Sequence, residues 1–171
     1  MIADPARRGQ ALAEFYRTVA PRLFRDLEES GALPAGTDSA ASERAREEWE
    51  CFALYACVRA LVAAGGFNRE TGAAIEALHE SALGAPGALT SERAPRPSER
   101  RARVAERYAE YGAIGQEGGA AGAATVTRRL GEAAARHMAA PERAHESLAE
   151  IAGTLHEQLV EGATEAVRIA E

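Results

Sequence analysis

Two Glu-x-x-His steps hold the residues best able to do chemistry. Glu76 precedes His79, and Glu142 precedes His145, by three positions each. Residues three apart share one face of a helix, so each step can offer a carboxylate and an imidazole to one metal ion. Carboxylate bundles that bind two metals use two such steps together with a Glu from each of two other helices. The spacing raises the hypothesis of a helical bundle that holds two iron or manganese ions.

A simpler interpretation of the same residues is that they are solvated or capping groups. Glu is abundant in this chain, so a Glu three places before a His is expected by chance. Glu142 also follows Pro141 directly, where a carboxylate in a first helical turn complements the helix dipole. The metal site is therefore kept as an alternative, and the preferred interpretation has no cofactor.

A second candidate is a cluster of arginines between residues 93 and 107. Arg100, Arg103 and Arg107 fall on one side of a predicted helix, next to Tyr108 and Tyr111. Such a stripe can hold an acidic partner or a phosphate. Glutamates on the same helix offer the alternative of a salt-bridged solvated face. We place a predicted partner-contact surface on these five residues.

Several chemistries are excluded by the residues that the chain lacks. All 20 basic residues are Arg, so there is no lysine for a Schiff base or a phosphate loop. No Gly-x-Ser-x-Gly elbow is present. The glycine-rich run from Gly112 to Gly122 does not follow a strand and has no dinucleotide motif. That run predicts a helix break or a close approach of two backbones.

Charge and cysteine usage limit the partners and the compartment. The net charge of -6 argues against a nucleic-acid partner. Cys51 and Cys57 lie six apart, which suits neither a metal pair nor a disulfide, so we expect two free buried thiols. Free thiols are typical of a reducing cytoplasm. No apolar stretch has the length of a membrane span or a leader, so we expect a cytoplasmic protein without a membrane partner.

The elements that must position these groups are all helices. We predict a central helix over residues 43–64, because they hold the only Trp, both Cys and the densest apolar sequence. Further helices are expected over 4–30, with Pro21 as a kink or a break, over 68–83, from 98 into the glycine-rich run, over 123–138 and from 141 onward. No segment alternates like a strand. We predict one all-α domain over 1–171, an antiparallel bundle of five to six helices, one with a Gly-rich break, and a long loop at 84–98 with freedom to move.

Trp49, Phe52, Tyr55 and Val58 form an aromatic and apolar stripe on the central helix. Such stripes at helical spacing are usually core, although they can also line a ligand pocket or a dimer seam. Since no catalytic motif is convincing, the preferred hypothesis is a non-catalytic module that binds another protein or a second copy of itself as a homodimer. The alternatives are the two-metal carboxylate bundle and a helical bundle that binds an apolar small molecule.

Overall fold

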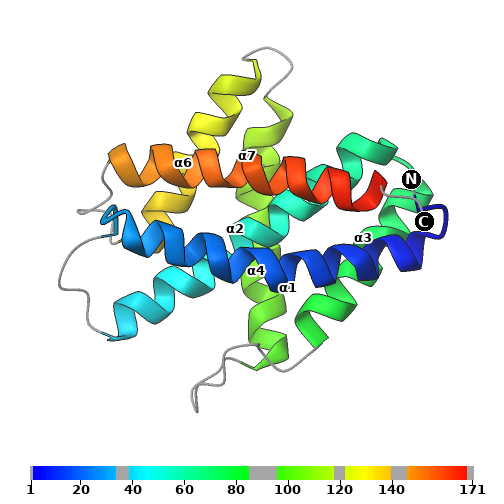
Figure 1. Ribbon diagram of the computed structural model, residues 1–171, viewed down its shortest axis with the longest axis horizontal. Coiled ribbons are helices and arrows are strands. Elements are labelled where there is room, and N and C mark those ends of the chain that lie inside the picture. Colours follow the sequence, from blue (N-terminus) through cyan, green and yellow to red (C-terminus); the bar gives the residue numbers. More distant parts are fainter. Residues whose placement is uncertain (1, 34–38, 85–95, 118–121, 140–145, 169–171) are drawn as a thin grey trace.

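The computed structural model describes residues 2–33, 39–84, 96–117, 122–139 and 146–168. These residues form six helices and no strand, packed together as one bundle (Figure 1). The predicted all-α bundle of five to six helices is confirmed. The helices are α1 (Pro5–Glu29), α2 (Ser39–Gly65), α3 (Arg69–Gly84), α4 (Pro97–Gln116), α6 (Ala123–Met138) and α7 (Glu146–Arg168).

Local signals explain where several helices begin and end. Asp4 caps α1 by accepting a hydrogen bond from the Ala6 amide at 2.9 Å, and Pro5 takes the first helical position. Asn68 caps α3 in the same way, through the Thr71 amide at 2.9 Å. α2 ends at Gly65, and Gly66 adopts the left-handed conformation with φ of 73° that favours glycine. These three boundaries match the sequence prediction.

Two predicted interruptions have different outcomes. Pro21 was expected to cause a kink or a break. It lies inside α1, which runs as one helix from Pro5 to Glu29, so the break does not occur. α4 continues through Gly112 and Gly115 to Gln116. The glycine-rich break was predicted within the run from Gly112 to Gly122. Residues 118–121 of that run lie outside the described part of the chain, so the break stays a prediction.

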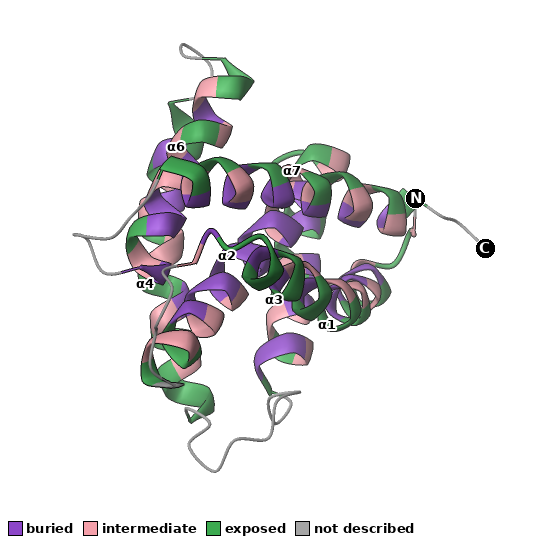
Figure 2. Cartoon of the chain, turned by 60° about the vertical axis from the view of Figure 1, so that its left-hand side comes forward, coloured by how far each residue is buried: buried purple, intermediate pink, exposed green. Residues whose placement is uncertain are grey.

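α2 is the central helix, and it packs against each of the other five. α1 and α7 lie side by side and antiparallel in front of it, while α4 and α6 run across them behind (Figure 1). Buried residues face α2 from all sides, and the exposed ones point outward (Figure 2). Trp49 is 1% exposed and donates to the Ala20 carbonyl of α1 at 2.9 Å, which fixes α2 against α1. Cys51 and Cys57 are free and buried, as predicted.

α6 and α7 cross at two glycines. A Cβ atom added to Gly131 would overlap the carbonyl oxygen of Ala149, and one added to Gly153 would lie 3.0 Å from the carbonyl oxygen of Thr127. Only a residue without a side chain lets the two backbones approach this closely. The close crossing therefore depends on glycine at both positions.

The first and last described residues meet at one end of the molecule. The Ile2 amide donates to the Val167 carbonyl at 3.0 Å. Arg8 is 3% exposed, and its guanidinium donates to the carbonyls of Ile2 and Ala3 at 3.0 and 3.3 Å. These bonds hold the start of the chain against the end of α7. None of the six helices has the length and apolar character that a membrane span requires.

Candidate functional site

The arginines predicted as a contact surface form a row of ion pairs between α4 and α2. Arg103 contacts Glu47 at 2.6 Å, and Arg100 contacts Glu50 at 3.5 Å. Both glutamates come from the charged first half of the central helix, while Arg107 also contacts Glu106 of α4 itself at 3.0 Å. The row therefore joins two helices that are far apart in the sequence, and it neutralises much of the positive charge of α4.

Arg107 and Glu48 make the tightest pair of this row. The Nε and Nη2 atoms of Arg107 donate to the two carboxylate oxygens of Glu48 at 2.6 and 2.9 Å. Their side chains are only 15% and 6% exposed. The hydrogen bonds to Glu48 raise the pKa of the Arg107 guanidinium above its ordinary value. A bidentate and largely desolvated pair of this kind fixes the register of α4 on α2.

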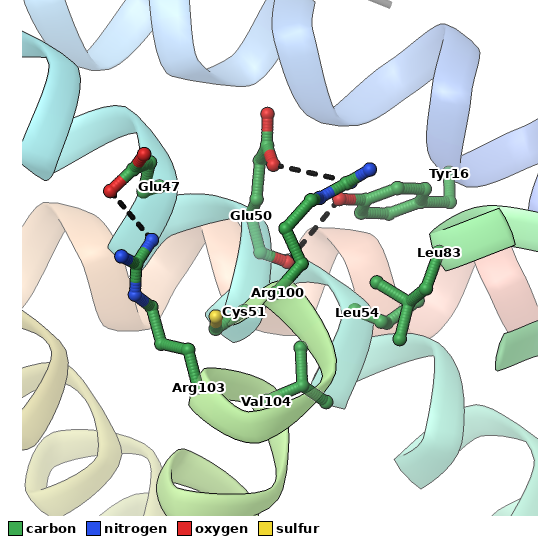
Figure 3. Close-up of a pocket in the computed structure, with 9 residues that line it drawn as sticks. All are labelled: Tyr16, Glu47, Glu50, Cys51, Leu54, Leu83, Arg100, Arg103 and Val104. Carbon is green, nitrogen blue, oxygen red and sulfur yellow. Dashed lines mark hydrogen bonds and ion pairs between the residues drawn. The ribbon is translucent and has the colours of Figure 1, made fainter. Parts of the chain in front are cut away.

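A small cavity lies beside this row, between α1, α2, α3 and α4 (Figure 3). Its polar side carries Glu47, Glu50, Arg100, Arg103 and the Tyr16 hydroxyl, and its apolar side carries Cys51, Leu54, Leu83 and Val104. Burial raises the pKa of the Glu50 carboxyl, and the nearby Arg100 opposes that shift. The cavity measures about 10 Å³, close to the least that admits one water molecule. An organic ligand does not fit there without movement of α4.

The two tyrosines of the predicted contact surface point inward. Tyr111 is 0% exposed, and its ring lies 5.3 Å from the ring of Phe52. Tyr108 is half-buried, with its hydroxyl 3.1 Å from Nε2 of His79. The structure thus brings all five predicted residues onto one helix, but it uses their side chains mainly to attach that helix to the bundle.

The structure describes only half of the predicted metal ligands. Glu76 is exposed on α3, while His79 on the same helix is half-buried and faces Tyr108. Burial lowers the pKa of His79, and the charge of Arg101 adds to this effect. Glu142 and His145 lie outside the described residues. Within the described ranges, no three His, Cys, Asp or Glu side chains gather closely enough to hold an ion.

His156 is a buried polar group that was not among the predicted site residues. It is 0% exposed, and its ring stacks on Phe52 with 4.1 Å between ring centroids. Neither ring nitrogen makes a hydrogen bond with a described residue. Burial lowers the pKa of His156 well below its ordinary value, with a further contribution from Arg59. His156 is therefore held neutral, between α7 and α2.

His137, in the last turn of α6, makes an interhelical contact. Its Nε2 atom lies 2.6 Å from one carboxylate oxygen of Glu110, and Arg136 lies 3.0 Å from the other. Partial burial raises the pKa of Glu110, but the hydrogen bonds and charges of His137 and Arg136 outweigh it, so the pKa is lowered overall. This cluster attaches α6 to α4.

An open groove of about 880 Å³ lies between α6 and α7. Its floor is made of small residues, which are Ala124, Thr127, Ala135, Ala149, Gly153 and Thr154. Charged residues rim it, with Arg128, Glu132 and Arg136 on α6 and Glu146 and Glu150 on α7. No aromatic or large aliphatic side chain lines the groove, in contrast to most small-molecule pockets.

This groove was not predicted from the sequence. Close packing was expected at the glycines from Gly112 to Gly122, whereas the close crossing uses Gly131 and Gly153. A usable signal existed in the small residues spaced by four, Thr127, Gly131 and Ala135 on α6 and Ala149 and Gly153 on α7. Small residues at that spacing let two helix backbones approach.

Comparison of the chain with protein-family models, with curated proteins and with solved structures gives no match. Function must therefore be argued from the geometry of the molecule itself.

Proposed function

We propose that this protein is a non-catalytic helical module that associates with a second copy of itself through the groove between α6 and α7. The observation that supports the proposal is the groove itself. It is open, it measures about 880 Å³, and it has walls of opposite charge. The proposal thus assigns the interaction module and homodimer expected from the sequence to one specific surface.

The floor of the groove suits a helix better than a small molecule. Ala124 and Thr154 are exposed and small, so a helix of another copy can approach the groove at these positions without displacing a large side chain. Recognition of a helix in a groove uses positions spaced by three and four residues. The lining residues of α7, at 146, 149, 150, 153 and 154, have this spacing.

The α4 surface predicted from the sequence is a weaker place for a partner. Arg100, Arg103 and Arg107 each contact a glutamate of α2, so a partner would have to displace these ion pairs. Glu146 and Glu150 on α7, in contrast, have no ion pair with a described residue and are exposed. We therefore place the contact on α6 and α7.

The test is the mass of the untagged protein over a range of concentrations, measured by light scattering and by native mass spectrometry. We expect a dimer that dissociates on dilution. A monomer at every concentration would overturn the proposal.

A variant that obstructs the groove tests whether the groove is the contact surface of the dimer. Thr154→Arg adds a long side chain at an exposed position on the groove floor, and we expect it to weaken the dimer. Thr18→Arg adds the same side chain at an exposed position of α1 outside the groove, and it should leave the dimer unchanged. Equal effects of the two variants would contradict the assignment to the groove.

A further inference from the structure

We infer that the two copies meet about a two-fold axis that passes through the groove, with α6 of each copy against α7 of the other, so that Arg128 and Arg136 pair with Glu146 and Glu150 of the second copy. This inference rests on the proposed self-association and adds the arrangement and the contacts that carry it.

The distribution of charge around the groove supports a two-fold arrangement. A symmetric dimer uses the same patch on both copies, so the patch must be complementary to itself. The α6 wall has two arginines and one glutamate, and the α7 wall has two glutamates. When two such patches meet about a two-fold axis, the basic wall of each copy faces the acidic wall of the other. The same contact is then made twice.

The arginines of α6 have unused donors for this contact. The Arg128 side chain is 64% exposed and contacts Glu132, and the Arg136 side chain is 50% exposed and contacts Glu110 through Nη2. A guanidinium has five N–H donors, so each arginine can keep its present partner and also donate to a second carboxylate. Arg128 and Arg136 lie about 12 Å apart along α6 and thus bracket the acidic segment, whose two glutamates are about 6 Å apart.

The acidic wall has no ion-pair partner among the described residues of its own chain. Glu146 and Glu150 lie in the first turns of α7, are exposed, and form no ion pair with a residue in the described ranges. They are therefore the natural acceptors for arginines that approach from a second copy.

A charge-swap experiment tests this arrangement. The first variant carries Arg128→Glu with Arg136→Glu, and the second carries Glu146→Arg with Glu150→Arg. Each variant alone should fail to dimerise, with Kd raised on the order of a hundredfold, because four contacts across the axis become repulsive. An equimolar mixture of the two should form a heterodimer, since every acidic wall then faces a basic one.

A control variant separates these contacts from a general effect of charge. Arg22→Glu with Arg25→Glu makes the same change in net charge as the first variant, but at two exposed positions of α1. This control should dimerise like the wild type. Circular dichroism and thermal melting of every variant would show that the fold is retained.

The outcomes distinguish this inference from the proposal on which it rests. If the wild type is a dimer and both charge variants remain dimers, the arrangement is wrong while self-association stands. If each variant is monomeric and the mixture stays monomeric, the pairing of α6 with α7 of the other copy is also wrong. A monomeric wild type would overturn both.

Discussion

At the scale of single residues, the bidentate pair of Arg107 and Glu48 illustrates that the contribution of an ion pair to stability depends on its burial. Arg103 and Glu47 lie at the same 2.6 Å, but their side chains are 29% and 30% exposed, against 15% and 6% for Arg107 and Glu48. Exposed pairs contribute little because water and salt screen them, whereas loss of one member of a buried pair leaves an unpaired charge. The two arginines should therefore respond differently to the same substitution.

We expect Arg107→Met to lower the free energy of unfolding by about 3–5 kcal/mol, because the Glu48 carboxylate is left buried and unpaired. Arg103→Met should lower it by about 0–1 kcal/mol. Urea unfolding at neutral pH measures both values. Equal effects of the two substitutions would contradict the assignment of the buried pair.

His156 should make the stability of the protein depend on pH. Its folded pKa is lowered, so on acidification the unfolded chain takes up a proton while the folded chain does not. Stability is therefore greatest above the ordinary histidine pKa of about 6.5 and falls by up to about 1.4 kcal/mol per pH unit below it. The lowered pKa of His79 acts in the same direction.

His156→Leu removes the larger of these contributions and should flatten the fall in stability between about pH 6.5 and pH 5. Thermal melting at a series of pH values, for the wild type and the variant, measures the difference. Superimposable pH profiles would show that His156 gains its proton as easily in the folded chain as in the unfolded one.

At the scale of the helices, one added methyl group at the close crossing of α6 and α7 should change the stability of the protein. Gly131→Ala would place a Cβ on the Ala149 carbonyl and force the helices apart, so we expect a loss of about 1–3 kcal/mol or more. Gly112→Ala, inside α4, meets no atom within 4 Å and should raise stability by about 0.5–1 kcal/mol, since alanine favours a helix. Chemical denaturation of both variants tests the contrast, and a neutral Gly131→Ala would exclude a tight crossing.

The boundaries of the helices were largely predictable from sequence because they depend on local chemistry. Asp4 with Pro5, Asn68 and the Gly65-Gly66 step fix their ends through bonds to adjacent residues. The partners of the α4 arginines were not predictable in this way. Sequence spacing offered glutamates on the same helix, whereas the structure supplies most of the partners from α2, 50 or more residues away. Such pairs follow from tertiary packing, which no local pattern contains.

For the molecule as a whole, the position of α2 at the centre was predictable because its second half has few charged residues. The order in which other helices surround it was not, and neither was the groove between α6 and α7. Composition also affects association. With a net charge of -6 on each chain, two copies repel at long range, so a dimer must depend on short-range contacts.

The hydrogen bond between Ile2 and Val167 joins the residues just before α1 to the last turn of α7. The path of the described backbone is therefore nearly a closed ring. A short linker could join these ends, and the exposed turn at Gly66 and Phe67 could be opened in their place, without altering which helix contacts which. The fold is thus compatible with circular permutation, and its packing does not require the helices to follow one another from this particular starting point.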